Sequence, residues 1–178
     1  SAGSYTDTEG RSECELCNAG TFQSLPGATS CEACKPGSYC PEGASAALVC
    51  SAGSYSDATN LTSDSECTPC SEGSACAPGS TKPSACSAGS YTDTEGRSEC
   101  ELCNAGTFQS LPGATSCEAC KPGSYCPEGA SAALVCSAGS YSDATNLTSD
   151  SECTPCSEGS ACAPGSTKPS ACSAGSYT

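Results

Sequence analysis

The sequence has no histidine, methionine or tryptophan, and only two of its 178 residues are phenylalanine. Without histidine, it lacks the side chain that most often serves as a general acid or base near neutral pH. A nucleophile elbow of the form G-x-S-x-G and a phosphate-binding loop are also missing. We therefore expect a protein that is not an enzyme and that has no catalytic residue, cofactor or metal ion.

Large apolar residues are scarce, since isoleucine is absent and leucine, valine and phenylalanine together number twelve. Burial of apolar surface contributes roughly 25 cal/mol per Å², which is too little here to offset a chain entropy of about 1–2 kcal/mol per residue. No apolar stretch reaches the length of a signal peptide or a membrane span. We expect no conventional core and no membrane insertion within this segment, with the targeting and anchoring signals outside it.

Positive charge is also scarce, because six basic residues face twenty acidic ones and the net charge is −14. Neither sign forms a run. Such a balance disfavours nucleic acid and anionic membrane surfaces as partners. A solvated, self-repelling surface is the simplest interpretation.

What the sequence has in abundance is cysteine, with 20 residues of this type. That share, about 11%, is above the level that marks a disulfide scaffold. Cross-links can supply the order that a small core cannot, since a 15-residue loop is worth roughly 3 kcal/mol. Disulfides persist in oxidising compartments, so we expect an extracellular or cell-surface protein.

The sequence repeats itself. Residues 1–86 and 87–172 are identical, and residues 173–178 match the first six residues again. We expect two repeat units with these bounds and the start of a third unit at 173–178. The chain is then a segment of a longer tandem array.

Each 86-residue unit divides into five smaller modules of two kinds. Modules of kind A read x-A-G-[ST]-[YF], a polar stretch and C-x2-C, whereas modules of kind B read x-x-G-S-x-C-x2-G-x6-C. Their order is A-A-B-A-B, at residues 1–17, 18–34, 35–50, 51–70 and 71–86. Repeats of this size are typical of arrays in which each module contacts mainly its neighbours.

Secondary structure is predicted to be sparse. The GSY and GTF segments favour short strands whose aromatic residue lies over a disulfide, and Leu25–Thr29 and Thr94–Arg97 favour hairpin turns. Ala44–Val49 is the one mildly helical stretch, and it is too short to stand alone. The predicted fold class is a set of small disulfide-rich modules with short β-hairpins, little helix and no conventional core, forming an elongated tandem-repeat rod.

The tandem register restricts the disulfide pairing, because one scheme must serve every copy. The cysteine before each A module pairs with the first cysteine of the following C-x2-C, and the remaining cysteines pair locally across the B modules. The predicted bonds are Cys17–Cys31, Cys34–Cys40, Cys50–Cys67, Cys70–Cys76, Cys86–Cys100, Cys103–Cys117, Cys120–Cys126, Cys136–Cys153 and Cys156–Cys162. Cys14 and Cys172 are left to pair outward, with the continuation of the chain or with another copy. A crossed alternative joins Cys34 to Cys50 and sends Cys40 to a neighbouring module.

A zinc site is a competing interpretation of the same cysteines. Cys14, Cys17, Cys31 and Cys34 have the spacing C-x2-C-x13-C-x2-C, which is close to a four-cysteine zinc site. This interpretation leaves Cys40 and the other B-module cysteines unexplained. Disulfides are therefore favoured, and a thioredoxin-like role for C-x2-C is weaker still because no βαβ pattern surrounds it.

Two tripeptides match the acceptor rule for N-linked glycans, one in each copy of the longest A module. They begin at Asn60 and Asn146 and read N-L-T. Because they lie in polar loops of a cysteine-rich chain, we predict that both asparagines carry glycans.

Two segments carry a resemblance to a known module. CNAGTFQSLPGATSCEACKPGSYC (Cys17–Cys40) and CSAGSYSDATNLTSDSECTPCSEGSAC (Cys50–Cys76) resemble the ephrin-receptor-like cysteine-rich repeat. The A loop is also similar to the first half of a tumour-necrosis-factor-receptor module, in which the equivalent first two cysteines pair. The resemblance implies a receptor ectodomain or a large surface protein of algae or protists, including the flagellar hairs called mastigonemes. The B modules depart from the receptor pattern.

Two functions fit these observations. One is a structural segment of an extracellular, glycosylated fibre, with other copies of itself as partners. The other is a cysteine-rich stalk or ligand-binding ectodomain of a receptor or adhesin. Identical copies favour the fibre, since a ligand site normally has its anchoring side chains in one place.

Overall fold

The computed structural model describes residues 1–173 of the chain. The predicted third unit at 173–178 therefore lies outside the described residues, apart from Ser173. No α-helix occurs among residues 1–173, and no helix there is long and apolar enough to cross a membrane. Two 3-10 helices are present, η1 (Asp64–Glu66) and η2 (Asp150–Glu152).

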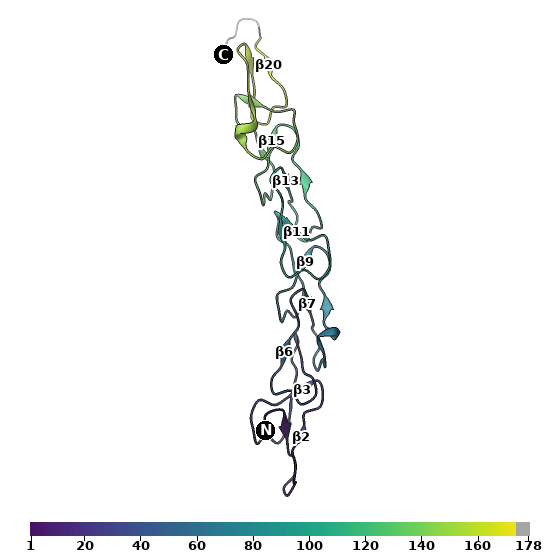
Figure 1. The fold of residues 1–178 in the computed structure, drawn as a ribbon. Helices are drawn as coiled ribbons and strands as arrows, with labels where there is room; N and C mark the ends of the chain where they lie inside the picture. Colours follow the sequence, from purple (N-terminus) through teal and green to yellow (C-terminus); the bar gives the residue numbers. More distant parts are fainter. Residues whose placement is uncertain (174–178) are drawn as a thin grey trace. The chain divides into compact units, whose positions relative to one another are not determined.

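All of the strands in residues 1–173 are two residues long, and they form two-stranded antiparallel hairpins of consecutive strands (Figure 1). The strands are β1 (Ser4–Tyr5), β2 (Glu15–Leu16), β3 (Thr21–Phe22), β4 (Glu32–Ala33), β5 (Ser38–Tyr39), β6 (Leu48–Val49), β7 (Ser54–Tyr55), β8 (Thr68–Pro69), β9 (Ser74–Ala75), β10 (Ser84–Ala85), β11 (Ser90–Tyr91), β12 (Glu101–Leu102), β13 (Thr107–Phe108), β14 (Glu118–Ala119), β15 (Ser124–Tyr125), β16 (Leu134–Val135), β17 (Ser140–Tyr141), β18 (Thr154–Pro155), β19 (Ser160–Ala161) and β20 (Ser170–Ala171).

The sequence motif of a module explains its hairpin. In the second A module, the predicted strand Thr21–Phe22 pairs with the two residues enclosed by C-x2-C, so that Phe22 lies opposite Glu32. The hairpin closes where the Cys34 N–H donates to the Gly20 carbonyl, at 2.9 Å. Cys34 is fully buried, whereas β4 before it is exposed. The motif thus places one cysteine at the base of each hairpin, and this residue is buried in the hairpins from β1–β2 to β15–β16.

The B modules form the same hairpin with a different return strand. Leu48 and Val49, which precede Cys50, pair with Tyr39 and Ser38. The weak helical tendency of Ala44–Val49 is therefore overridden, because its last two residues complete a hairpin. Tertiary context routinely outweighs helix propensity in so short a segment.

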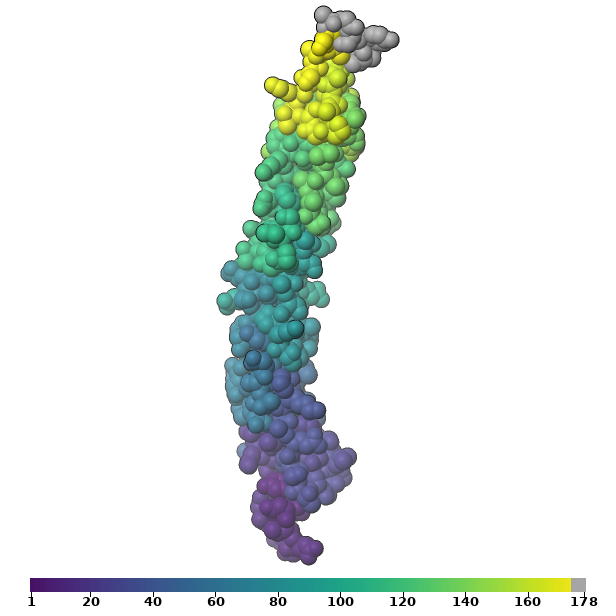
Figure 2. Space-filling view, turned by 180° about the vertical axis from the view of Figure 1, so that it is seen from behind, coloured from purple at the N-terminus to yellow at the C-terminus, as the bar shows by residue number. Residues whose placement is uncertain are grey.

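Contacts divide the chain into two compact units. Unit 1 comprises Ser1–Ser84 with Thr94–Glu99, and unit 2 comprises Ala85–Asp93 with Cys100–Thr178. Within each unit, residues close in sequence stay close in space, as the gradual change of colour shows (Figure 2). Each module packs against the next module and the one after it along the chain, as in a repeat protein whose contacts are limited to nearby units.

Neighbouring modules are joined through their backbones. The Gly20 N–H donates to the Cys40 carbonyl of the next module at 2.7 Å, and Phe22 forms a parallel bridge with Ala44. The Phe22 ring packs against the cluster of Cys34, Cys40 and Ala44. This arrangement confirms that the aromatic residue of the strand lies over a disulfide.

One glycine shows how closely the modules approach. A Cβ atom added to Gly20 would lie 2.5 Å from the backbone oxygen of Asn60, and its φ of +87° is one that other residues rarely adopt. A side chain at this position would separate the two modules. Small residues and sulfur thus replace the large apolar side chains that the sequence lacks, which confirms the predicted fold class of small disulfide-rich modules.

Candidate functional site: the disulfide frame and the glycosylation loops

Residues 1–173 contain nine disulfides, which follow one another along the chain without crossing. They join the pairs of the sequential scheme, with Cα–Cα distances from 5.6 to 6.2 Å, and the crossed bond between Cys34 and Cys50 does not occur. The bonds are Cys17–Cys31, Cys34–Cys40, Cys50–Cys67, Cys70–Cys76, Cys86–Cys100, Cys103–Cys117, Cys120–Cys126, Cys136–Cys153 and Cys156–Cys162.

The cysteines of the alternative zinc set are divided among different bonds. Cys17 pairs with Cys31, and Cys34 pairs with Cys40. A disulfide sulfur has no thiolate to offer, and thiolate is the form that binds zinc. The set therefore does not form a metal site in this structure.

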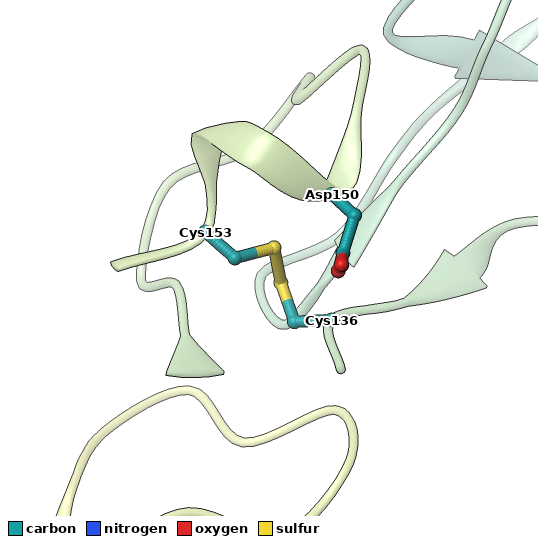
Figure 3. A group of neighbouring side chains, drawn as sticks. All are labelled: Cys136, Asp150 and Cys153. Atoms are coloured by element: carbon teal, nitrogen blue, oxygen red, sulfur yellow. A yellow bond between two sulfur atoms is a disulfide. The ribbon is translucent and has the colours of Figure 1, made fainter. Parts of the chain in front are cut away.

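One other group of potential ligands lies close together in unit 2. Cys136, Asp150 and Cys153 have ligand atoms within 4.8 Å of one another (Figure 3). The two sulfurs are bonded to each other, and the Asp150 carboxylate instead accepts hydrogen bonds from Ser137. The arrangement is a braced disulfide and not a metal centre.

The first predicted glycan acceptor, Asn60, is at the tip of the hairpin between β7 and β8. Its φ is +62°, and its backbone N–H donates to the Cys34 carbonyl at 3.0 Å. Its side chain is exposed, and within residues 1–173 no side-chain hydrogen bond reaches its amide. The backbone of Asn60 therefore belongs to the frame, while its side chain is available to carry a glycan.

The two residues after Asn60 are held in place. Leu61 is 8% exposed and packs with Cys50, Cys67 and Tyr39. The Thr62 N–H donates to the Glu66 carboxylate at 3.2 Å, and its hydroxyl donates to the same oxygen. The Thr62 hydroxyl lowers the pKa of Glu66, because both hydrogen bonds favour the charged form.

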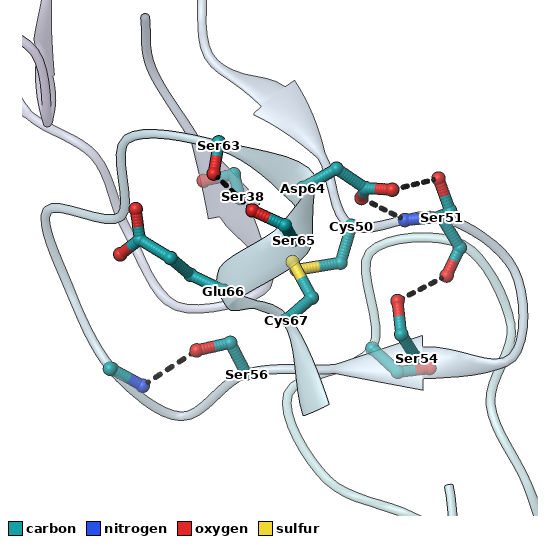
Figure 4. The surroundings of a disulfide bond; sticks show 12 residues. Ser38, Cys50, Ser51, Ser54, Ser56, Ser63, Asp64, Ser65, Glu66 and Cys67 are labelled. Atoms are coloured by element: carbon teal, nitrogen blue, oxygen red, sulfur yellow. Dashed lines mark hydrogen bonds between the residues drawn. A yellow bond between two sulfur atoms is a disulfide. The ribbon is translucent and has the colours of Figure 1, made fainter. Parts of the chain in front are cut away.

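The long loop is anchored at its other end by Asp64, at the start of η1. The Ser51 N–H and hydroxyl donate to the two carboxylate oxygens of Asp64 at 2.8 and 2.7 Å (Figure 4). These bonds lower the pKa of Asp64, with the hydroxyl of Ser51 as the largest cause. The carboxylate thus braces the two sides of the Cys50–Cys67 bond, since Ser51 follows Cys50.

The second copy reproduces this arrangement. Asn146 has φ +63° and an exposed side chain, and Leu147 is 8% exposed. Asp150 accepts the bonds from Ser137, whose hydroxyl and N–H lower its pKa. The two predicted glycan acceptors therefore share one local environment.

Cys14 and Cys172 are the free thiols among residues 1–173, with Cys14 exposed and Cys172 partly exposed. These are the two cysteines expected to pair outward. Neither forms a disulfide within residues 1–173, and their outward pairing stays a prediction.

Sequence reasoning missed the residues that fix the loops. Neither Asp64 nor Gln23 was predicted from the sequence to have this role. Gln23 is 6% exposed, donates to the Ser30 carbonyl at 2.7 Å and accepts from the Leu25 N–H at 2.9 Å. The sequence does hold a signal for Gln23, because a glutamine that is buried next to an aromatic strand must satisfy its amide within the fold.

Comparison with protein families gives a match over part of the chain. Residues 3–47 match the family described as Tyrosine-protein kinase ephrin type A/B receptor-like. This is a disulfide-rich, non-catalytic repeat domain typical of extracellular segments, and no catalytic family matches. The sequence of residues 3–47 recurs without change at 89–133. A comparison with curated proteins gives no significant match. The chain therefore carries an ephrin-receptor-like cysteine-rich domain at its N-terminus and is built of repeated disulfide-rich modules.

Proposed function

We propose that the chain is a structural segment of an extracellular, glycosylated fibre, in which sequential disulfides and backbone ladders replace a hydrophobic core. Its partners are other copies of the same repeat. The single observation that supports this function best is that corresponding modules of the two copies are joined by the same backbone contacts. Gly20 donates to Cys40 at 2.7 Å in unit 1, and Gly106 donates to Cys126 at 2.7 Å in unit 2.

Recurrence favours a mechanical role because a binding site concentrates its energy in a few anchors. Hot spots are enriched in tryptophan, tyrosine and arginine and gather at one place on a surface. Here tryptophan is absent, and each tyrosine or arginine of residues 1–86 returns 86 residues later. A surface without a distinct centre suits repeated lateral or axial contacts.

The predicted glycans at Asn60 and Asn146 fit the same function. The net charge of −14 already opposes aggregation, and glycans would add a hydrophilic coat to a surface that includes exposed leucines such as Leu25 and Leu111, both 67% exposed. Glycopeptide mass spectrometry of native material tests this part. Bare asparagine at both positions would rule the glycans out.

The folded loop indicates that the glycan is attached before the disulfide around it forms. The Leu61 side chain is buried and the Thr62 hydroxyl is engaged by Glu66 in the folded hairpin. The acceptor rule includes the threonine, so an enzyme that reads N-x-T must reach the Thr62 hydroxyl as well as the asparagine. We therefore expect the sugar to be attached before the Cys50–Cys67 bond closes.

Electron microscopy of native material, captured with an antibody against residues 1–86, tests the fibre. The expected result is filaments with a constant axial repeat. Isolated membrane-anchored molecules without filaments would contradict the proposal. That outcome would favour the second candidate, a receptor or adhesin stalk, which the receptor-like match over residues 3–47 supports.

A further inference from the structure

The basic residues decide where one large class of proteases can cut this chain. Proteases of the trypsin type hold a lysine or arginine side chain in an acidic pocket and cut the peptide bond that follows it. The chain has six basic residues, of which four are lysines and two are arginines. Each of them marks a bond that such a protease could recognise.

Every lysine is followed by a proline. The pairs are Lys35–Pro36, Lys82–Pro83, Lys121–Pro122 and Lys168–Pro169. Proline has no backbone N–H and carries a ring on its nitrogen. It therefore fits poorly into the extended, hydrogen-bonded pairing by which a protease holds a peptide. The lysine bonds are poor substrates on sequence grounds alone, which leaves the bonds after arginine.

The bond after Arg97 lies in a hairpin tip, Thr94–Glu99. Arg97 is half-buried, and the other five residues of the tip are exposed. Exposed tips with small and polar residues are the sites at which folded proteins are most readily nicked. Exposure alone would make Arg97–Ser98 a target.

The tip is held by backbone contacts with an earlier hairpin of unit 1. The Gly96 N–H donates to the Cys70 carbonyl at 2.8 Å, and the Cys76 N–H donates to the Arg97 carbonyl at 3.0 Å. The Gly96 carbonyl fills the space that a Cβ atom on Gly53 would occupy. Gly53, Cys70 and Cys76 thus form a seat for the tip.

These contacts engage the groups that a protease needs. A serine protease attacks the carbonyl carbon of the bond it cuts and stabilises the oxygen with N–H donors of its own. The oxygen in question belongs to Arg97, and it already accepts from Cys76. The Arg97 Nε donates to the Thr94 hydroxyl at 2.9 Å, so the guanidinium is also held within the tip. The bond can be cut only after the tip leaves its seat.

A disulfide encloses the same bond. Cys86 pairs with Cys100, and Arg97–Ser98 lies within the loop that they close. Hydrolysis would add one water molecule, leaving a carboxylate on Arg97 and an amine on Ser98, and would not touch the S–S bond. The two pieces would therefore stay joined.

We propose that this repeat resists proteases of the trypsin type. Proline protects the lysine bonds, the seat withholds Arg97–Ser98, and the Cys86–Cys100 loop keeps the chain connected if that bond is cut. The proposal goes beyond the structural function proposed above and does not rest on it.

The test uses the full 178-residue chain with its nine disulfides formed and with Arg11→Gln, so that Arg97 is the one arginine. This parent chain is incubated with trypsin, and the products are identified by mass spectrometry. We expect it to stay intact for a time in which the reduced and alkylated chain is cut completely after Arg97. The lysine bonds should survive in both. Equal rates for the two forms, or cuts after lysine in the reduced form, would overturn the proposal.

A seat variant tests the cause of the protection. Gly53→Ala should displace the tip and speed cleavage at Arg97–Ser98 by about tenfold or more, since cleavage follows the population of the open form. The matched control is Gly106→Ala, which has the same φ of +87° but whose Cβ would meet Asn146 in another tip. Its cleavage rate at Arg97–Ser98 should equal that of the parent chain. Equal rates for the two variants would contradict the seat.

The nicked product tests the disulfide loop. Nicked Gly53→Ala should migrate as one chain in denaturing electrophoresis until reductant separates residues 1–97 from 98–178. Separation without reductant would overturn this part of the proposal. If Gly53→Ala does not form its nine disulfides, a urea series on the parent chain replaces it. Cleavage that does not become faster with urea would contradict the seat.

Discussion

Two hairpins of unit 2 share one frame and differ in their loops. The hairpin closed by Cys103–Cys117 has Gly113 at its tip, and the hairpin closed by Cys136–Cys153 has Asn146 there. Both tip residues have positive φ, and both donate a backbone N–H to a cysteine carbonyl, at 2.8 Å for Gly113 and 3.0 Å for Asn146.

What differs is the side chain that fixes each loop. Gln109, a buried neutral amide, accepts from the Leu111 N–H at 2.9 Å in the short loop. Asp150, a carboxylate, accepts from the Ser137 N–H at 2.9 Å in the long loop. The frame is thus built from backbone and sulfur, so loops can change length, charge and modification without disturbing it.

The largest effect is expected from reduction of the disulfides, on which both hairpins depend. The loops closed by Cys103–Cys117 and Cys136–Cys153 span 14 and 17 residues, and each bond contributes about 3 kcal/mol in the chain-entropy model. Full reduction should therefore unfold both, since no apolar core remains to hold either. Circular dichroism and proteolysis before and after thiol treatment measure this. A fold that survives complete reduction would show that another interaction dominates.

Two glycine-to-alanine substitutions should have smaller effects on stability, and they compare a position in contact with another module with a position that faces open space. Gly106→Ala places a Cβ 2.6 Å from the Asn146 carbonyl, whereas Gly139→Ala has nothing within 4 Å; their φ values are +87° and +86°. Both substitutions carry the left-handed penalty of about 1–2 kcal/mol, and Gly106→Ala adds an overpacking cost of about 1–3 kcal/mol. Denaturant unfolding of the two variants with disulfides intact compares them. Equal stabilities would mean that modules separate at little cost.

Acid should change the hydrogen bonds of the loop that contains Asp150 and leave those of the loop fixed by Gln109 unchanged, without unfolding the frame. The pKa of Asp150 is lowered below its ordinary value of 3.8 by the Ser137 hydroxyl and N–H, so the contribution of these bonds is complete above pH 3.8. It is lost as the pH falls through the lowered value in the folded state. The amide resonance of Ser137 should then shift, while that of Leu111, bound to a neutral amide, should not.

The matched variant for the acid experiment is Asp150→Asn, which keeps an acceptor oxygen but removes the titrating group. Its Ser137 resonance should be independent of pH in the same range. A shift that persists in this variant would place the titration elsewhere.

The local part of this fold could be predicted from the sequence. The bonds Cys17–Cys31 and Cys34–Cys40 join cysteines close in the chain, and the strand Thr21–Phe22 lies beside a C-x2-C that supplies its partner. Short closures cost little entropy, so local pairing and hairpins follow from spacing.

The contacts between modules could not be predicted in the same way. Gly20 approaches the carbonyl of Asn60, 40 residues away, and nothing in the A-G-[ST]-[YF] motif specifies that partner. The position of Asn60 at a hairpin tip could have been predicted by aligning the A modules, because Gly10, Gly27 and Asn60 are each the tenth residue of their module. Such an alignment would have predicted a left-handed conformation, which asparagine tolerates better than most residues.

The smallest expected effect concerns that asparagine. If the frame uses only the backbone of Asn146, then Asn146→Gly should leave the unglycosylated protein almost unchanged. Glycine removes the left-handed strain of a side chain at φ +63° but raises the entropy of the unfolded chain, and each effect is about 1 kcal/mol or less. Asn146→Val is the contrasting variant, because a β-branched residue is a marked outlier at positive φ and should destabilise by about 1–3 kcal/mol. Both changes are made together with the same change at Asn60, since the two loops are identical, and denaturant unfolding gives the difference in stability.

A loss of several kcal/mol in the glycine variant would mean that the asparagine side chain supports the fold. A near-zero change would leave the glycan as the reason for asparagine at a position where every other tip has glycine.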